Sequence, residues 1–484
     1  MMLNKLKTTY NKLPLPVKAS FWFMFAEMIN KGISFISTPI FTRLLSKSDY
    51  GYNSVYNSWA TILSIIATLQ LSTGVFNKAM VKYEDARKEY TSSMLVITTL
   101  ITLLNMTAVI ILYPYLEKII GLPISYIYIL YINILFSSAA SFWMARERFS
   151  YNYKSVVSVT VVTNILAVAL SLLLVIENDS DKVFYRLLGI LIVHVVVYGV
   201  IFVKVIIEGK RLINVEYWKY SILYNLPLVP HYLSQQVLNQ SDRIMISNMC
   251  GSSDAAVYSL AYQLAILMQL VINAIHATFM PWTFQKLKKG QNKDIGLRSL
   301  QIEVIIGVLC LTFSLFAPEL ILILGGKDYS VAVYIVPPVS MSVLLMTIYS
   351  FYGNIQFYYE KTTFVMAASI ITAFLNVALN YVFIDKYGFI AAGYTTLFCY
   401  IVYSAIHYTF MIRVCRELNV ENPYNGKPMF LIAILFSLIS ISISFLYEFV
   451  IIRYIVILVL ALAVCIWISK NKDILKKIFY ERNG

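Results

Sequence analysis

Two ionisable residues lie in the middle of the first long apolar stretch of the chain. Glu27 and Lys31 are four residues apart, so on a helix they share one face. A lysine at the centre of a span cannot reach water, and charge at that depth is tolerated only beside a polar cavity or a partner. We expect Lys31 to line a cavity and bind an anion, with a buried Glu27–Lys31 ion pair as the alternative. Glu27 is also a candidate coupling residue, because burial favours proton binding by a carboxylate.

A second group of polar side chains interrupts the seventh apolar stretch. It comprises Asn225, His231, Ser234, Gln235, Gln236, Asn239, Gln240, Ser241, Asp242 and Arg243. Such density is unfavourable against lipid and indicates a face on water or on a hydroxyl-rich ligand. We expect Arg243 and His231 to contact that ligand; the alternatives are an interfacial or lobe-to-lobe Asp242–Arg243 pair and a packing role for His231. Pro227 and Pro230 remove backbone donors and should loosen this helix.

The remaining charges and metal-binding residue types form no recognisable site. Arg43 ends the first stretch, where it either binds the same anion or extends to the interface. Glu303 is expected at the solvated cytoplasmic end of the ninth stretch. The four histidines and five cysteines lack metal or disulfide spacing, so we expect no metal, no cofactor and no catalytic residue.

The elements that position these residues are long apolar helices. Hydrophobic residues make up 59% of the 484 and charged residues 13%, whereas a soluble protein carries about 25% charged residues. Continuously apolar stretches recur along the chain, which predicts an all-α multi-pass membrane protein and excludes the alternating pattern of a β-barrel. The net charge of +14 is typical of cytoplasmic loops rather than of nucleic-acid binding.

We predict fourteen membrane-spanning helices. They cover residues 19–42, 53–75, 92–114, 123–145, 155–176, 186–207, 220–248, 255–284, 299–323, 331–353, 362–384, 388–412, 429–448 and 450–469. One alternate set of connections, including both termini, holds 29 lysines and arginines, and the other set holds nine. This asymmetry predicts that both termini are cytoplasmic.

A repeated segment divides the chain. Ser48-Asp49-Tyr50-Gly51 opens the second helix and Ser253-Asp254-Ala255-Ala256 opens the eighth, each followed by a similar tyrosine-containing run. Six helices separate the copies, so both point the same way, as in two-lobed transporters with parallel repeats. We expect six-helix bundles over residues 1–210 and 211–413, with helices 13 and 14 and a cytoplasmic tail over 414–484.

The segments that open these repeats carry a family resemblance. Pro39-Ile-Phe-Thr-Arg43-Leu-Leu-Ser-Lys-Ser-Asp49-Tyr50-Gly51, Asp242-Arg243-Ile-Met-Ile and Ala256-Val-Tyr-Ser-Leu-Ala-Tyr262 are similar to segments of bacterial polysaccharide and O-antigen repeat-unit flippases. These proteins form the polysaccharide transporter branch of the multidrug, oligosaccharidyl-lipid and polysaccharide exporter superfamily. The resemblance implies a MATE-like pair of bundles, alternating access, and location in the bacterial cytoplasmic membrane.

The resemblance also implies a cargo, an undecaprenyl-pyrophosphate-linked oligosaccharide moved from the inner to the outer leaflet for O-antigen or capsule synthesis. Its implied partners are membrane lipids, and a polysaccharide polymerase and chain-length regulator are further candidates. The residues fit such cargo, because phosphates need cations and sugars need hydroxyl and amide groups. A drug or small-cation antiporter remains an alternative, although acidic residues would then dominate the cavity. A membrane polymerase is disfavoured because no connection is long enough for a catalytic domain.

Overall fold

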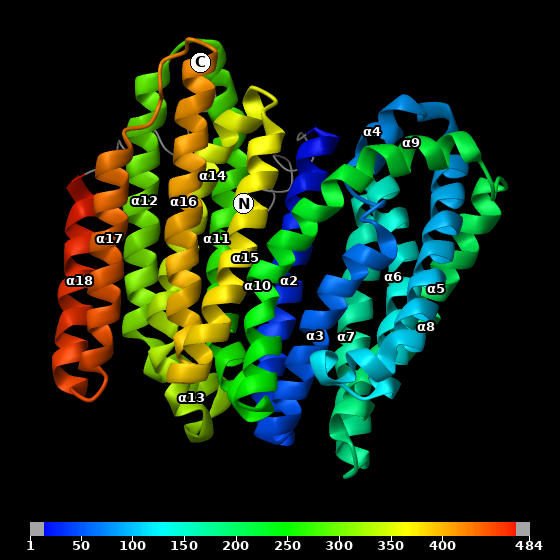
Figure 1. Cartoon of the computed structure of the whole chain (residues 1–484), viewed down its shortest axis with the longest axis horizontal. Helices are drawn as coiled ribbons and strands as arrows, with labels where there is room; N and C mark the ends of the chain where they lie inside the picture. The colour runs from blue at the N-terminus through cyan, green and yellow to red at the C-terminus, as the bar shows by residue number, and fades with distance from the viewer. Residues whose placement is uncertain (1–13, 471–484) are drawn as a thin grey trace, which may run out of the picture. The chain divides into compact units, whose positions relative to one another are not determined.

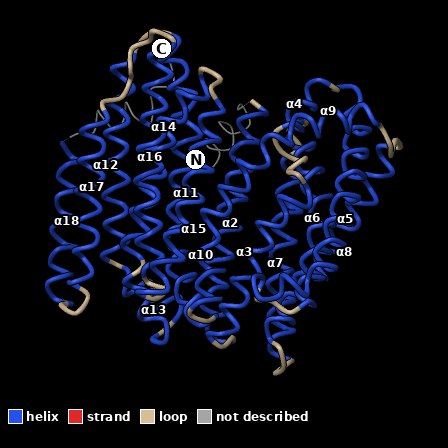
Figure 2. Tube along the Cα trace, in the orientation of Figure 1, coloured by secondary structure: helices blue, strands red, loops and turns tan. Residues whose placement is uncertain are grey.

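The computed structural model describes residues 14–470, which form helices and connecting loops with no strand among them (Figures 1 and 2). The chain divides into two compact units, Met1–Ala256 and Val257–Gly484. The helices of the first unit are α2 (Leu15–Leu44), α3 (Lys47–Thr68), α4 (Val75–Lys82), α5 (Arg87–Ile120), α6 (Ile124–Phe149), α7 (Tyr153–Glu177), α8 (Lys182–Gly209), α9 (Val215–Asn225) and α10 (Val229–Met249).

Helix α11 (Ser252–Lys288) starts in the first unit and continues into the second. The other helices of the second unit are α12 (Asn292–Leu315), α13 (Ala317–Gly325), α14 (Val336–Tyr358), α15 (Thr362–Tyr387), α16 (Ala391–Glu417), α17 (Gly426–Ile443) and α18 (Val450–Lys470). Short 3₁₀ segments occupy Glu84–Ala86, Leu226–Leu228, Lys327–Tyr334 and Ser444–Leu446.

The number of long helices agrees with the sequence prediction. Eleven described helices are long and apolar enough to cross a membrane. Helices α2, α3 and α10 have 30, 22 and 21 residues, so they are long enough to span but are more polar. Together they give the predicted fourteen, and the all-α multi-pass fold class is confirmed.

The start of α3 is set by a capping box that the apolar pattern did not reveal. The Ser46 hydroxyl accepts a hydrogen bond from the Asp49 amide at 3.1 Å, and the Asp49 carboxylate accepts one from the Ser46 amide at 3.3 Å. These bonds satisfy amides that a helix start otherwise leaves unpaired. The sequence prediction of a helix over 53–75 therefore started six residues too late, because α3 begins at Lys47.

The predicted seventh helix is two helices. Helix α9 ends at Asn225, the segment around Pro227 is a 3₁₀ turn, and α10 begins at Val229. The buried Asn225 side chain donates hydrogen bonds to the carbonyls of Leu69 and Gln70, at 2.7 and 2.8 Å. The prolines thus accompany a real break, and Asn225 ties this break to the C-terminal end of α3.

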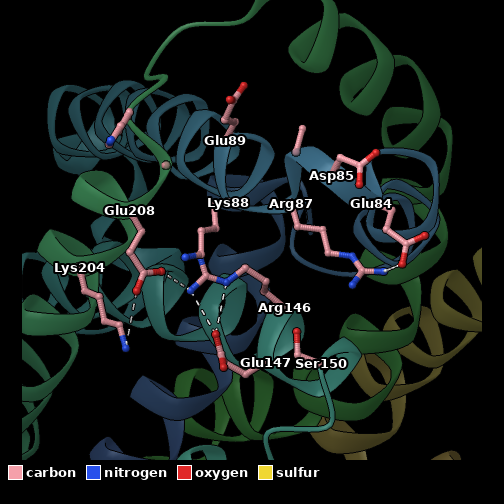
Figure 3. A pocket seen from close by; sticks show the side chains of 13 residues that line it. Glu84, Asp85, Arg87, Lys88, Glu89, Arg146, Glu147, Ser150, Lys204 and Glu208 are labelled. Carbon is pink, nitrogen blue, oxygen red and sulfur yellow. Dashed lines mark hydrogen bonds and ion pairs between the residues drawn. The ribbon is translucent and has the colours of Figure 1, made fainter.

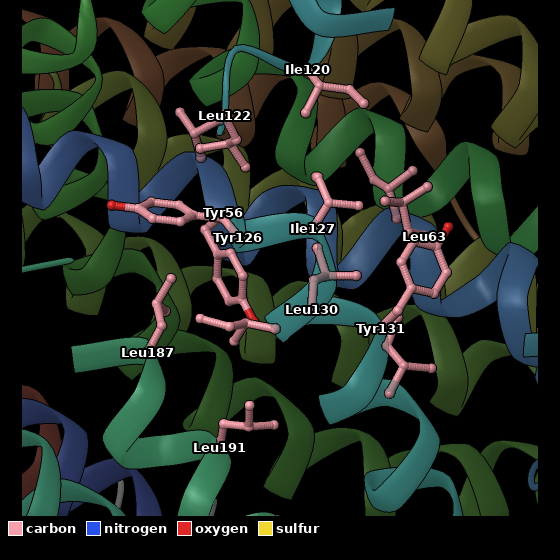
Figure 4. Close-up of a cluster of buried hydrophobic side chains, with 14 of the residues drawn as sticks. Tyr56, Leu63, Ile120, Leu122, Tyr126, Ile127, Leu130, Tyr131, Leu187 and Leu191 are labelled. Atoms are coloured by element: carbon pink, nitrogen blue, oxygen red, sulfur yellow. The ribbon is translucent and has the colours of Figure 1, made fainter. Parts of the chain in front are cut away.

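The core of the first unit packs α6 against α3, α5 and α8 (Figure 4). Its buried members include Leu63, Tyr126, Leu130, Tyr131 and Leu187. The Tyr131 hydroxyl donates to the Asn105 side chain at 2.6 Å, so its polar end is satisfied. This cluster fixes one side of α3, whose other neighbour is α10.

In the second unit, the largely buried α14 packs against α12, α16 and α17. Helix α18 is anchored by the buried Arg453, whose guanidinium donates to Glu319 of α13 and to the Leu315 carbonyl, both at 2.9 Å. A paired guanidinium in this position ties the last helix to the end of α12.

Candidate functional site

All the site residues expected from the sequence lie in the first unit, on α2 and α10. Of the described helices with at least 18 residues, only α2, α3 and α10 fall outside the apolar set. Helix α3 packs closely on α10. Polar spanning helices are stable only where water, ligand or protein meets their polar face, so these helices are the best candidates to line a path.

Exposed polar residues of α2 gather on one side of the helix, where the exposed Met24 and Met28 lie beside them. Glu27, Lys31 and Ser34 are exposed and follow one another at helical spacing. Phe25 and Ile36 are exposed about a third of a turn away. The predicted alternative of a buried Glu27–Lys31 ion pair is wrong, because both residues are exposed and no such pair forms among residues 14–470.

The rotation of α2 is fixed by its contact with α7. The Asn164 side-chain amide donates to the Asn30 side-chain oxygen at 2.7 Å. About two helical turns before Asn30, the ring of Trp22 stacks on the ring of Tyr153 of α7, with the ring centroids 6.3 Å apart. These contacts turn Glu27 and Lys31 away from α7 and leave the Lys31 ammonium accessible to a ligand.

Arg243 is held inside the α10–α3 contact. It is 6% exposed, and its guanidinium donates to the Asn239 carbonyl at 2.7 Å and to the Gln240 side chain at 3.1 Å. The Gln240 oxygen also accepts from Ser58 of α3 at 3.2 Å. The adjacent Asp242 is fully buried. Neither residue is a surface-exposed interfacial charge.

The other α10 residues expected to contact a ligand are half-buried. His231, Gln235 and Asn239 recur every four residues and therefore share a face, while Gln236 lies beside them. The Gln235 and Gln236 amides form no hydrogen bond with any described residue, so their donors and acceptors are available to a ligand. Arg43 is exposed at the end of α2, with its guanidinium donating to the Pro39 carbonyl at 2.7 Å.

Sequence reasoning missed a cation that lies against α2 and α3 in this unit. Arg186 of α8 lies with its guanidinium carbon 3.8 Å from the centroid of the Phe41 ring and 6.0 Å from that of Tyr50. Its Nε and Nη1 atoms are buried without a hydrogen-bond partner among the described residues. Tyr50 is within electrostatic reach of both Arg186 and Arg243. The predicted sixth helix, 186–207, begins at Arg186, so nothing in the sequence marked this residue as part of a site.

A charged pocket of the first unit is a different feature (Figure 3). Its volume is about 690 Å³, and charged residues from α5, α6 and α8 line it. The buried Arg146 bridges Glu147 at 3.1 Å and Glu208 at 2.7 Å, and Lys204 approaches Glu208 at 3.8 Å. None of the expected site residues lines this pocket, and its charges largely satisfy one another.

Comparison with known proteins identifies the family. The model of the polysaccharide biosynthesis protein family matches residues 17–287, and the MatE model matches residues 227–382. An Lsg locus protein of Haemophilus influenzae is 25% identical over 75% of this chain and 89% of its own length. The Haloferax volcanii protein named "Probable low-salt glycan biosynthesis flippase Agl15" is 19% identical over 81% of this chain and 82% of its own length.

Solved structures share the fold. The lipid II flippase MurJ in an inward closed conformation superposes with a TM-score of 0.66 at 14% identity, covering 94% of this chain and 99% of MurJ. An inward-facing multidrug resistance MATE transporter gives a TM-score of 0.60 at 13% identity, covering 82% and 95%. The match over more than half of the chain, with this fold, shows that the chain belongs to the polysaccharide biosynthesis protein family of the multidrug, oligosaccharidyl-lipid and polysaccharide exporter superfamily, as its motifs indicated.

Proposed function

We propose that this chain is a flippase for undecaprenyl-pyrophosphate-linked oligosaccharide repeat units. It moves them from the inner to the outer leaflet of a bacterial cytoplasmic membrane by alternating access, for surface polysaccharide such as O-antigen or capsule. The observation that carries the proposal is the placement of Lys31, which is exposed in the middle of a spanning helix and forms no ion pair with Glu27. An exposed ammonium at that depth suits an anionic ligand.

The chemistry of such cargo assigns a role to each polar group. Lys31 attracts the pyrophosphate, and so does Arg243, which is buried between α10 and α3. Arg186 and Arg43 are further cations of the first unit. The amides of Gln235, Gln236 and Asn239 and the imidazole of His231 offer hydrogen bonds to sugar hydroxyls. Glu27 is a candidate to carry a coupling ion, and Asp242, next to Arg243 in the chain, is a candidate to hold that guanidinium between transport cycles or to carry the ion.

The start of α11 offers a closing contact for alternating access. The Ser48 hydroxyl lies 2.6 Å from the Ser252 hydroxyl, so the first copy of the repeated segment contacts the residue that directly precedes the second copy. With both termini in the cytoplasm, this contact closes the outer side. Outward movement of an anion then gains about 2.3 kcal/mol per charge per 100 mV of membrane potential, so ATP is not needed.

We also propose the organisation that the repeat predicts, with bundles over 1–210 and 211–413 and two added helices over 414–484. A polysaccharide polymerase and a chain-length regulator are the proposed partners at the outer face. The relatives named as flippases and transporters, rather than enzymes, support a non-enzymatic role.

A cation-coupled antiporter of the same superfamily is the second candidate. The MatE match to residues 227–382 favours it. An antiporter for cationic drugs needs an acidic path, whereas the charged residues on α2 and α10 are two acids and four bases: Glu27 and Asp242 against Lys18, Lys31, Arg43 and Arg243. The excess of cations supports the anionic cargo.

The test is glycan export in a host strain that lacks its own copy and any paralogue. The wild-type gene should restore surface glycan, and Lys31→Ala should restore at most a tenth of it at equal expression, because loss of about 1.4 kcal/mol of phosphate attraction is tenfold. Lys386→Ala, which removes an exposed lysine at the end of α15, is the matched control. Full export by Lys31→Ala would contradict the phosphate contact assigned to Lys31. Full export by the deletion strain would contradict the proposed function.

A further inference from the structure

A carboxylate without a partner is buried in the second unit. Glu303 lies in α12 with no exposed surface, and neither of its carboxyl oxygens has a hydrogen-bond partner among the described residues. No lysine, arginine or histidine in residues 14–470 forms an ion pair with it. Burial of an ionised carboxylate without such partners is very unfavourable, so a proton must neutralise it in this packing.

The sequence placed Glu303 differently. It was expected at the solvated cytoplasmic end of a helix over 299–323, and this expectation is wrong. Helix α12 starts at Asn292 and ends at Leu315, so Glu303 is eleven residues inside a 24-residue helix. At 1.5 Å per residue it lies about 16 Å from the helix start, close to the middle of the span.

The titratable group within electrostatic reach of Glu303 is a phenol. Tyr352 of α14 is within electrostatic reach of Glu303, and its hydroxyl donates to the Met429 sulfur of α17 at 3.5 Å. The Tyr352 ring also contacts the rings of Tyr408 of α16 and of Tyr424, and the distances between ring centroids are 5.1 and 5.4 Å. Helices α14, α16 and α17 therefore bring phenols and a thioether, rather than a cation, toward this position.

Charged residues near α12 are engaged elsewhere. Arg298, one turn and a half before Glu303, donates to Gln301 at 3.3 Å. Arg453 of α18 and Glu319 of α13 pair with each other at the opposite end of α12, beside Leu315. Neither the cytoplasmic side nor the far end of the helix supplies a counter-ion for Glu303.

We propose that Glu303 is a proton-binding site whose occupancy controls the packing of α12 against α14 and α17. In the observed packing the side chain is a neutral carboxylic acid. Release of the proton to water produces a carboxylate, which requires water or a cation and therefore requires that this contact opens. A proton entering from the outside and leaving to the cytoplasm would in this way be linked to the conformational cycle. The inference rests on the proposed transport function, to which it adds the coupling ion.

The surroundings select a proton rather than a metal ion. Hard cations need several oxygen ligands, and the described residues contain no group of three or more His, Cys, Asp or Glu side chains that could hold one. A single carboxyl group can bind one proton, but with only a nearby phenol beside it, it offers too few oxygen ligands for such a cation. The tight fit also leaves little room, because a methyl group at Gly307, one turn further on, would lie 2.8 Å from the Phe436 ring.

Infrared spectroscopy of the purified full-length protein tests the protonation state directly. The wild type should show the carbonyl band of a protonated carboxyl group at neutral pH, and Glu303→Gln should lose it. Glu421→Gln makes the same change at an exposed site and should retain the band. The band should disappear reversibly as pH rises. Absence of a Glu303-dependent band at neutral pH, or a band that persists unchanged to high pH, would overturn the proposal.

Transport with imposed gradients tests the coupling. In energised cells or vesicles, glycan delivery by the wild type should fall at least tenfold when the pH difference is collapsed and the membrane potential is kept. Glu303→Gln should lose this dependence, whereas Glu421→Gln should keep it. An unchanged pH-gradient dependence in a folded Glu303→Gln protein overturns the proton site. Absence of glycan delivery by the wild type instead contradicts the transport function, so the two failures are distinguishable. If the Glu303→Gln protein does not accumulate in the membrane, the infrared titration of the wild-type protein decides whether a buried carboxyl group is protonated at neutral pH.

Discussion

The contact between Gly51 and Ser252 predicts that adding a single methyl group to Gly51 will weaken the packing of α3 against the start of α11. Gly51 of α3 lies against the start of α11, where a Cβ atom would be 1.8 Å from the Ser252 carbonyl oxygen and 2.5 Å from its carbon. Real Cβ atoms essentially never approach within 3.0 Å of such atoms, so Gly51→Ala must separate the two backbones by at least about 1.2 Å. Both clashing atoms belong to the backbone, so no side-chain rotation relieves them.

The expected cost follows from overpacking of a tight contact. We expect Gly51→Ala to destabilise this packing by about 1–3 kcal/mol, which favours the open contact by roughly one to two orders of magnitude. The Ser48–Ser252 hydrogen bond, 2.6 Å long, should break in the same step. Gly32→Ala is the matched control, because a Cβ at Gly32 of α2 meets nothing within 4 Å.

The assay is disulfide formation between Ser48→Cys and Ser252→Cys, in a background whose five native cysteines are replaced by alanine. Touching hydroxyls place the two sulfur atoms near bonding distance, so oxidation should cross-link the parent protein rapidly. Gly51→Ala should slow the reaction at least tenfold and lower the melting temperature, and Gly32→Ala should do neither. Equal cross-linking rates for Gly51→Ala and Gly32→Ala would refute the packing argument.

Two further predictions concern the ends of helices. Asn225→Leu should lower the free energy of unfolding by about 2 kcal/mol, because the Leu69 and Gln70 carbonyls lose their donor; a denaturant midpoint equal to that of the wild type would contradict this. Glu319→Gln should cost about 3 kcal/mol and release α18, because it leaves the buried Arg453 unpaired; thermal unfolding and protease sensitivity of the last helix measure it.

The Glu319–Arg453 pair also predicts a dependence on pH. Burial alone would raise the pKa of Glu319, but hydrogen bonds from Arg453 and Tyr454 hold it below its ordinary value. The pair therefore stabilises the fold above the pKa of the unfolded state, and this stability is lost as pH falls through the lower pKa of the folded state. The melting temperature of the wild type should fall on acidification more than that of Glu319→Gln. Parallel pH profiles would contradict the pair's contribution.

The fold was largely predictable because membrane helices are long and apolar. Fourteen stretches of sufficient length were visible, and their motifs indicated the family. The edges were less predictable because they depend on local bonds such as the Ser46–Asp49 capping box and on the 3₁₀ turn at Pro227. Neither feature changes the hydrophobicity of the stretch that contains it.

The candidate site was predictable only in part. The depth of Lys31 in a span follows from counting residues, and the polar spacing of α10 follows from its sequence. The burial of Arg186 against Phe41 and the isolation of Glu303 arise from contacts between helices far apart in the chain. A single sequence cannot reveal such contacts, because it does not show which face of each helix meets its neighbour.

The leaflet that holds the lipid-linked glycan is the sharpest test of the proposed flippase function. Sealed inner-membrane vesicles from the deletion strain, with and without the gene, would be treated with a membrane-impermeant glycosidase or periodate to measure how much glycan faces each side. We expect the undecaprenyl-linked repeat unit to remain on the cytoplasmic side without this protein and to appear on the outer side when the wild type, but not Lys31→Ala, is restored. Equal amounts on the outer side with and without the protein would contradict it.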